Sequence, residues 1–255
     1  MPNAARRSIS ATRRVGPNTI KKYRAPRALN KVQRLLLIGH GRMGRLVEAL
    51  APEYGFDVTG AIARGNADAP WPDAEVAIDF SVAEALPLTV AKLAPRGTPL
   101  VIGTTGWQSR EQEIREAATR HGIGVVAAPN FAVGVNLFLA LIDRAGALMS
   151  TQSAFGGWIH ELHHAAKKDA PSGTALAMQR ALRQAGYAAD VPIASTRAGA
   201  IPGTHTLGFD AASETITITH SARDRAAFAR GALEAARWVQ GRQGWFTMKD
   251  VLGLR

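Results

Sequence analysis

The stretch Leu35-Leu-Leu-Ile38, followed directly by Gly39-His-Gly41-Arg-Met-Gly44, decides the fold class of this 255-residue chain. The apolar run is typical of a buried strand, and the G-x-G-x-x-G pattern after it opens an amphipathic helix. In this context of strand, loop and helix, the pattern is typical of a loop that binds the pyrophosphate of a dinucleotide. Gly39 makes the tight turn, Gly41 lets the backbone approach the pyrophosphate, and Gly44 lets helix and strand pack closely. The loop residues expected to contact the cofactor are Gly39, Gly41, Arg42, Met43 and Gly44.

The next predicted strand ends in Ala63-Arg64, twenty residues past Gly44. An acidic residue at this point would bind the ribose 2′-hydroxyl of NAD, whereas an arginine suits the 2′-phosphate of NADP. Arg64 therefore favours NADPH as the cofactor and leaves NADH open. The alternative interpretation is an ordinary surface arginine.

Short apolar strands alternate with helices along the first half of the chain. This alternation predicts an α/β fold with a Rossmann-type doubly wound parallel sheet. The strands are expected at 34–38, 57–62, 75–79, 99–102 and 123–127, and the helices at 42–52, 82–94 and 108–120.

From about Phe131 the pattern changes to a helix near 135–149, a strand near 155–163, a helix after Gly173 and β-rich sequence at 191–220. This part predicts a smaller α+β domain for substrate binding and oligomerisation, with a mixed or antiparallel sheet. Residues 215–219 alternate at period two, as expected of a half-buried antiparallel strand. A helix at about 222–240 and the segment 246–252 would return to the first domain. The predicted divisions are a basic arm at 1–33, a dinucleotide-binding domain at 34–130, the substrate domain at 131–221 and the C-terminal return at 222–255.

The composition excludes several kinds of site. The chain contains no cysteine, which rules out disulfides, thiolate metal sites and a cysteine nucleophile. No apolar run approaches the ~20 residues that a membrane-spanning helix needs. A cytoplasmic protein is therefore expected.

The formal charge of +11 is concentrated in the first 34 residues, which hold ten Lys and Arg and no acidic residue. The remaining residues contain 21 basic and 20 acidic side chains and are nearly neutral. We expect this arm to be disordered in isolation, since it lacks hydrophobic periodicity. It could be a dispensable extension, an arm that contacts polyanions nonspecifically, or an organelle-targeting peptide.

The segment from Glu161 to Thr174 carries the candidate chemistry. His163, His164 and Lys167 can offer a proton near pH 7 and hold anionic oxygens. The turn Pro171-Ser-Gly-Thr174 then opens a helix whose first amides point at any anion that lies there. Such a segment can protonate and anchor an acidic small molecule, and a solvated polar loop before a capped helix is the simpler alternative.

Further motifs follow the glycine loop in order to the C-terminus. They are Ala77-Ile-Asp-Phe-Ser81, Val101-Ile-Gly-Thr-Thr-Gly106, Ala128-Pro-Asn-Phe-Ala-Val-Gly-Val-Asn136, the segment 161–174, Gly203-Thr-His-Thr206, Ile218-Thr-His220 and Phe246-Thr-Met-Lys-Asp-Val-Leu252. In this order they resemble the dihydrodipicolinate reductase family, the nicotinamide-dependent reductases of bacterial and plant lysine biosynthesis. The chain departs from longer members by lacking insertions between Arg64 and Glu75 and before Arg197, and its glycine loop is one residue shorter than in many of them.

The resemblance implies a role for each matching position. His163 would be the general acid, His164 would contact the substrate, and Lys167 would stabilise charge or donate a proton. The substrate would be a small cyclic dicarboxylate, 4-hydroxy-tetrahydrodipicolinate, and the assembly a homotetramer built through the substrate-domain sheet. The remaining implied substrate contacts are Ser172, Gly173 and Thr174, and the remaining cofactor contacts are Gly103, Thr105, Ala128, Asn130 and Phe131. His205, His220 and Arg225 also match family positions and would support the substrate domain.

Two alternatives compete with a reductase of this kind. One is another two-domain NAD(P)-dependent oxidoreductase of a small acid, which the segment 161–174 disfavours. The other is a nicotinamide-sensing protein that binds polyanions through the basic arm, in which the acid and carboxylate-binding residues would be unnecessary. The proposed chemistry requires no metal ion, and the paired histidines are assigned to acid chemistry rather than to metal binding.

Overall fold

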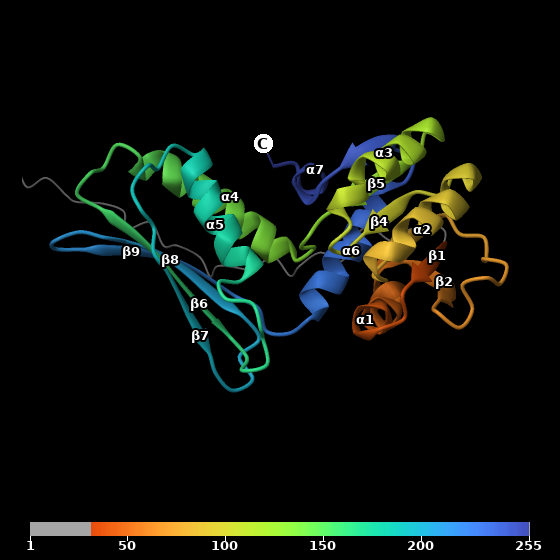
Figure 1. Ribbon diagram of the computed structural model, residues 1–255, viewed down its shortest axis with the longest axis horizontal. Helices are drawn as coiled ribbons and strands as arrows, with labels where there is room; N and C mark the ends of the chain where they lie inside the picture. Colours follow the sequence, from red (N-terminus) through yellow and green to blue (C-terminus); the bar gives the residue numbers. More distant parts are fainter. Residues whose placement is uncertain (1–31, 255) are drawn as a thin grey trace, which may run out of the picture. The chain divides into compact units, whose positions relative to one another are not determined.

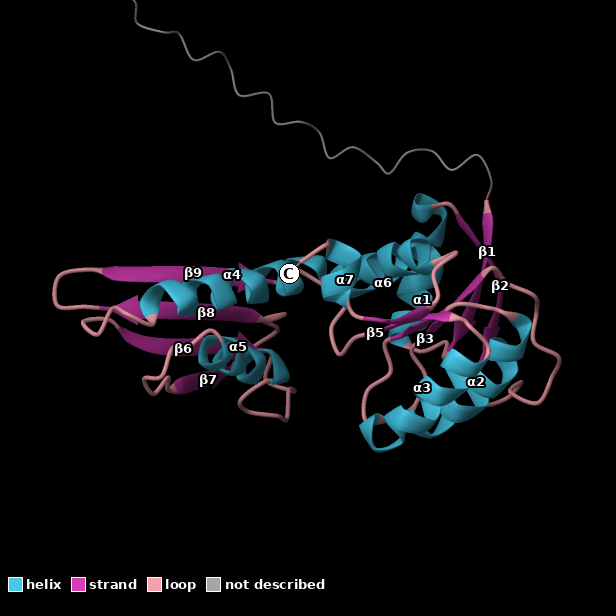
Figure 2. Cartoon of the chain, turned by 90° about the horizontal axis from the view of Figure 1, so that it is seen from above, coloured by secondary structure: helices cyan, strands magenta, loops and turns pink. Residues whose placement is uncertain are grey.

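The computed structural model describes residues 32–254, which contain two separate β-sheets (Figures 1 and 2). Residues 1–31 of the predicted basic arm lie outside the described residues. Among the residues described, no helix is both long and apolar enough to cross a membrane.

The first sheet has six parallel strands in the order β10-β5-β4-β3-β1-β2. Its strands are β1 (Gln33–Ile38), β2 (Phe56–Ile62), β3 (Val76–Asp79), β4 (Leu100–Ile102), β5 (Gly124–Ala127) and β10 (Gly244–Phe246). The connecting helices are α1 (Arg42–Leu50), α2 (Leu86–Leu93) and α3 (Glu111–Arg120), with 3-10 turns η1 (Ala51–Tyr54), η2 (Ala83–Ala85), η3 (Ala94–Arg96) and η4 (Gln108–Arg110). The doubly wound parallel sheet predicted from the sequence is confirmed.

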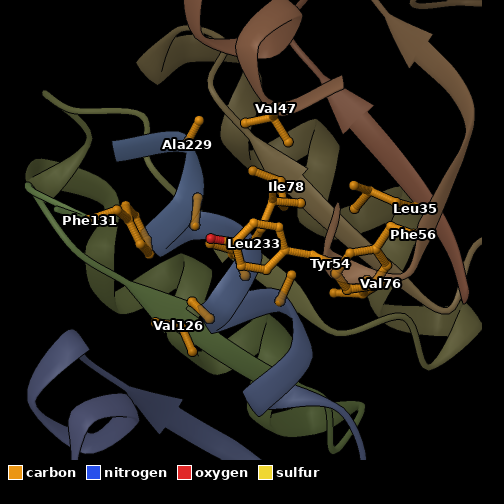
Figure 3. Close-up of a cluster of buried hydrophobic side chains, with 14 of the residues drawn as sticks. Leu35, Val47, Tyr54, Phe56, Val76, Ile78, Val126, Phe131, Ala229 and Leu233 are labelled. Carbon is orange, nitrogen blue, oxygen red and sulfur yellow. The ribbon is translucent and has the colours of Figure 1, made fainter. Parts of the chain in front are cut away.

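Helices cover both faces of this sheet, so its central strands are buried and apolar apart from Asp79 at the end of β3. The helices α1 and α6 (Ala226–Val239) lie over one face, and α2 and α3 lie over the other (Figure 1). On the first face, Leu35, Val76 and Ile78 belong to one buried cluster with Ala229 and Leu233 of α6, and Ile78 lies beside Leu233 (Figure 3). The small side chains of α6 allow close approach to the sheet, and the short helix α7 (Met248–Leu252) follows β10.

The glycine loop adopts the conformation that its spacing predicts. Gly39 has a φ of 88°, in the left-handed region that favours glycine. A side chain on Gly44 would collide with the carbonyl oxygen of Gly39, and the backbone at Gly41 borders open space. The N-terminus of α1 is therefore left accessible to an anionic ligand.

The second sheet has four strands in the order β7-β6-β8-β9. Its elements are β6 (Gly156–His163), β7 (Ile193–Arg197), β8 (Thr204–Asp210) and β9 (Thr215–Ser221), with α4 (Val133–Met149) and α5 (Gly173–Gln184). The strands β6 and β7 are parallel and the other pairs are antiparallel, so the sheet is mixed, as predicted. Both helices pack on one face over a core that includes Phe138, Ile159 and Phe209 (Figure 2).

Two expectations need correction in this region. The strand at 215–219 is antiparallel but less buried than predicted, because β9 is the edge strand and Ile216 is 40% exposed. The last long helix begins at Ala226 rather than near residue 222. The amide of Ala222 instead donates to Gly203, and the Asp224 side chain accepts the amide of Ala226.

Candidate active site

The glycine loop borders two cavities at the carboxyl end of the parallel strands, where ligands of such sheets bind. A cavity of about 510 Å³ is lined by residues that include Gly39, Gly41, Arg64 and Trp71. Trp71 is buried and donates its ring N–H to the carbonyl of Ala67, so the short segment after Arg64 folds back to form a wall. Arg64 is exposed beside this cavity, at the position where the sequence predicts a contact with the ribose of a dinucleotide.

The second, smaller cavity lies between the glycine loop and the loop after β4. It measures about 320 Å³ and is lined by Gly41, Arg42, Met43, Phe80, Ser81, Gly103, Thr104, Thr105 and Arg225. Glycine at position 103 is required here, because a side chain would collide with the ring of Phe80. The glycine loop therefore borders both cavities, and the loop after β4 closes the smaller one.

Asp79, at the end of β3, fixes the loop after β4. Its fully buried carboxylate accepts hydrogen bonds from the amide and hydroxyl of Ser81 at 2.8 and 2.6 Å, from Thr89 at 3.0 Å and from Thr104 at 2.7 Å. Burial raises the pKa of Asp79 above its usual value even though these bonds act to lower it. Asp79 thus joins β3, α2 and the loop that carries Gly103 and Thr105.

The largest of the three cavities lies beside the second sheet and holds every predicted substrate residue. It measures about 800 Å³, and its lining includes His163, His164, Lys167, Ser172, Gly173 and Thr174. Asn130, Gly203, His205, His220 and Arg225 line it as well.

The period-two alternation of β6 explains why His163 lies at this cavity. Glu161 and His163 are two residues apart and therefore face the helices, whereas His160 faces the other side and contacts the Thr196 hydroxyl at 3.0 Å. The chain then turns into α5. Ser172 is the N-cap of this helix, and its hydroxyl accepts a hydrogen bond from the amide of Ala175 at 3.2 Å. His163 and the N-terminus of α5 thereby meet at one cavity.

Behind His163 lies a buried ion-pair network. Glu161 is fully buried, and its carboxylate forms an ion pair with Nδ1 of His163 and with the Arg197 guanidinium, the latter at 2.7 Å. Burial acts to raise the pKa of Glu161, but hydrogen bonds and the charges of Arg197 and His163 outweigh it and lower the pKa to about 2. Glu161 is therefore ionised at neutral pH.

The protonation of His163 is set by opposing influences. Burial lowers the pKa of His163, Glu161 acts to raise it, and the charge of Lys167 acts to lower it, with a net result below the usual value. His205 packs edge-on against His163, with ring centroids 5.0 Å apart. Burial and the charge of His163 lower the pKa of His205 to about 4, so His205 is neutral near pH 7, and its Nε2 lies 3.1 Å from the Ser172 hydroxyl.

Lys167 is held by Asp169 in this structure. Its ammonium group lies 2.7 and 2.9 Å from the two carboxylate oxygens of Asp169, and the same ion pair lowers the pKa of Asp169. The Arg197 guanidinium donates to the backbone carbonyl of Asp169 and holds this turn against β7. An incoming carboxylate would compete with Asp169 for Lys167.

Two family models together match almost all of the described chain. One, described as dihydrodipicolinate reductase, N-terminus, matches residues 33–131, and the other, dihydrodipicolinate reductase, C-terminus, matches residues 134–252. The chain belongs to the dihydrodipicolinate reductase family.

Known relatives agree with this assignment. A 4-hydroxy-tetrahydrodipicolinate reductase of Acidiphilium cryptum is 40% identical over 237 residues, which cover 84% of this chain and 94% of the relative. One of Parvibaculum lavamentivorans is 41% identical over 220 residues, which cover 77% of this chain and 79% of the relative. A dipicolinate-bound dihydrodipicolinate reductase from Paenisporosarcina sp. TG-14 shares the fold, with a TM-score of 0.72 at 19% identity over 85% of this chain and 97% of that one. This family member is therefore an oxidoreductase that uses a nicotinamide cofactor.

Not every predicted cofactor residue of the reductase lines these three cavities. Gly44 supports the loop from beneath, the amide of Ala128 bonds to Ile102, and Phe131 is 2% exposed within the core against Phe80. Asn130 does line the cavity beside the second sheet, and its side chain accepts the amide of Ala132 just before α4.

The sequence interpretation of the reductase missed the network formed by Glu161 and Arg197. The spacing of Glu161 and His163 was the available signal, since residues two apart on a strand share a face. Arg197 gave no such signal, because it reaches the site only through the pairing of β7 with β6. Glu161, His163 and His205 also bring ligand atoms within 4.8 Å of one another, a spacing that a metal ion could use, but Arg197 already neutralises the carboxylate.

Proposed function

We propose that the chain reduces 4-hydroxy-tetrahydrodipicolinate to tetrahydrodipicolinate with a reduced nicotinamide cofactor, in the diaminopimelate route to lysine. The observation that carries the proposal is the cavity beside the second sheet. It combines a histidine suited to proton transfer, a lysine and the N-terminus of α5. A cyclic dicarboxylate needs all three features, because two carboxylates must be neutralised beside the atoms that react.

The proposed binding mode uses the two ends of the segment 163–174. One substrate carboxylate accepts hydrogen bonds from the Ser172 hydroxyl and from the amides of Gly173 and Thr174 at the start of α5. The other displaces Asp169 from Lys167, and His164 contacts the substrate from the end of β6. Gly173 favours the first contact, since open space surrounds its Cα on the side that a side chain would occupy.

His163 is the proposed general acid, at about 8% exposure on the wall of the cavity. The bound cofactor supplies a hydride to a ring carbon of the substrate. Overall, the substrate, the reduced cofactor and one proton give tetrahydrodipicolinate, the oxidised cofactor and water. His163 supplies that proton, and it gains it more readily once substrate carboxylates offset the charge of Lys167, because that charge lowers the pKa of the imidazole in the free protein. Lys167 holds negative charge during the reaction and is the second possible donor.

For the cofactor, we propose that NADPH is preferred over NADH. Arg64 lies beside the cavity next to the glycine loop, where its guanidinium can pair with a 2′-phosphate. The proposed cofactor contacts are Gly39, Gly41, Arg42, Met43, Gly44, Arg64, Gly103, Thr105, Ala128, Asn130 and Phe131, of which Ala128 and Phe131 would act through their backbone.

The experiment follows the absorbance of the reduced nicotinamide band, with NADPH and NADH measured side by side. The unstable substrate is generated in situ from pyruvate and aspartate semialdehyde by the preceding synthase. We expect rapid oxidation that depends on the synthase and is faster with NADPH. Tight nicotinamide binding without oxidation would contradict the reductase and favour a sensor. Equal rates with both cofactors would contradict the proposed role of Arg64 but not the proposed reduction itself.

The open face of the second sheet supports a proposed homotetramer. Opposite α4 and α5, this face carries the half-buried ring of Trp158 packed over Gly208, and hydroxyl pairs such as Thr206 with Thr219 at 3.0 Å. Light scattering should give the mass of four chains, and Thr219→Arg should reduce that mass. A monomer at micromolar concentration would contradict the proposal.

A further inference from the structure

Glu161 stands behind the general acid rather than in the cavity. Its carboxylate is fully buried, and neither Glu161 nor Arg197 is among the described residues that line the cavity. Substrate in the cavity would therefore touch His163 but not Glu161. Any contribution of Glu161 to the reaction must pass through the groups that it contacts.

The two oxygens of Glu161 contact three parts of the site. Oε2 pairs with Nδ1 of His163, while Oε1 accepts from the Arg197 guanidinium at 2.7 Å and from the amide of Ser172 at 3.3 Å. One carboxylate thus connects the acid, the cap of α5 and the last residue of β7. A displacement of Glu161 would move the proton donor and the carboxylate-binding turn together.

The contact with Nδ1 also fixes which nitrogen of His163 is free. An ionised carboxylate can only accept, so Nδ1 must carry hydrogen in both the neutral and the charged ring. Nε2 lies on the opposite side, where a side chain on Gly203 would come within 3.2 Å of it, and Gly203 lines the cavity. The proton that His163 exchanges with a ligand is therefore the one on Nε2.

We infer that Glu161 is a positioning residue of the proposed reduction, which holds His163 with Nδ1 protonated and Nε2 directed at the substrate. Arg197 keeps the carboxylate ionised and in place from β7. The inference rests on the proposed function for its consequence in turnover, but the orientation and tautomer of His163 can be measured without any reaction.

The main test compares Glu161→Gln with the wild-type chain. Removing the charge should reduce kcat by roughly 10²-fold, the scale of a positioned acid, with a much smaller change in KM. The pH profile should move to lower pH, because Glu161 acts to raise the pKa of His163. The other charged or titratable groups acting on His163 are Lys167, Arg197 and His205, and all of them remain in the variant.

A spectroscopic measurement separates this inference from the proposed function. In ¹⁵N-histidine spectra, the neutral ring of His163 in the wild-type chain should show hydrogen on Nδ1. Glu161→Gln should mix the tautomers and lower the pKa of the ring. This readout is independent of turnover, so a wild-type chain that fails to reduce the substrate would contradict the proposed function while leaving the positioning role open to measurement.

Control variants keep the test decisive. Glu214→Gln, at the exposed turn before β9, should change neither turnover nor the His163 spectrum. If Glu161→Gln does not fold, Glu161→Asp keeps the charge but withdraws it from Nδ1, and it should lower kcat while dipicolinate, used as the probe, still binds. A folded variant at Glu161 with wild-type kcat and a wild-type His163 titration would overturn the inference.

Discussion

Asp79 and Glu161 are both fully buried carboxylates, but the protein treats them in opposite ways. Asp79 is surrounded by hydroxyl and amide donors, and burial raises its pKa. Glu161 is held by Arg197 and His163, and although burial acts in the same upward direction, its pKa falls to about 2. A buried acid among neutral donors orders a loop, whereas one among cations transmits charge to its neighbours.

The difference follows the work proposed for each region. The loop after β4 must keep a fixed conformation if its small residues are to fit against a cofactor. Asp79 accepts four hydrogen bonds that hold this conformation. The segment after β6 needs a proton donor of defined orientation, and Glu161 supplies a fixed negative charge. Substitutions in the two regions should therefore change different properties.

The largest effect is expected from His163→Ala, which removes the proposed acid. Turnover should fall by ~10²-fold or more, the usual scale for a positioned acid, while nicotinamide affinity remains unchanged. Steady-state kinetics in the synthase-coupled assay and fluorescence titration with NADPH measure the two quantities. Near-normal turnover would show that another group donates the proton.

Asp79→Asn should act on stability. The amide group would present N–H to at least one of the hydroxyls of Thr89 and Thr104, which would lose a buried acceptor at a cost of about 1–3 kcal/mol. Urea unfolding measures this loss, and the His163 spectrum should stay that of the wild type. A stability equal to that of the wild type would mean that the hydroxyls turn to other acceptors.

Lys167→Ala should weaken dipicolinate binding by roughly tenfold, about 1.4 kcal/mol, because a charged partner of one carboxylate is lost. The loss is no larger than this because, in the wild-type chain, the substrate carboxylate must compete with Asp169 for the ammonium group of Lys167. Calorimetry with dipicolinate checks the value, and unchanged affinity would exclude this carboxylate contact. Lys168→Ala, the neighbouring substitution, serves as the control.

The smallest expected effect is a difference between Glu161 and Asp79 in how stability depends on pH. The pKa of Glu161 is lower in the folded chain, so its contribution to stability is complete above its ordinary value of 4.5 and is lost as the pH falls toward 2. The pKa of Asp79 is raised, so its ionisation opposes folding. This penalty is absent below its ordinary value of 3.8 and grows as the pH rises through the raised pKa. Stability differences from the wild type should therefore change in opposite directions for Glu161→Gln and Asp79→Asn between pH 5 and 3. Parallel curves would contradict the contrast.

Much of the fold could be predicted because its signals are local. The run Leu35–Ile38 and the glycines after it specify a strand, a turn and a helix within a few residues. His163, His164 and Lys167 lie within five residues of one another, and the turn before α5 indicated a helix N-terminus. Each of these features depends on neighbours in the sequence.

The two buried carboxylates could not be assigned in this way. Thr89 and Thr104 lie 10 and 25 residues beyond Asp79, and Arg197 lies 36 residues beyond Glu161, so each network exists only once strands and helices have paired. Phe131 shows the same limit, because the sequence alone does not distinguish an aromatic side chain that contacts a ligand from one that packs in the core. Its 2% exposure and edge-on contact with Phe80 are tertiary facts.

The position of β10 has a consequence for synthesis on the ribosome. This strand is formed by Gly244–Phe246, yet it pairs with β5, more than a hundred residues earlier. Until those residues have emerged, the edge of β5 that they will cover stays open, together with the apolar face that α6 will occupy. From the completion of β5 until β10 emerges, nascent chains therefore carry an unprotected strand edge, a state in which association with other chains competes with folding. The last strand of the second sheet ends at Ser221, before β10 is made. The second sheet, whose synthesis starts later, can therefore complete its folding before the first sheet does.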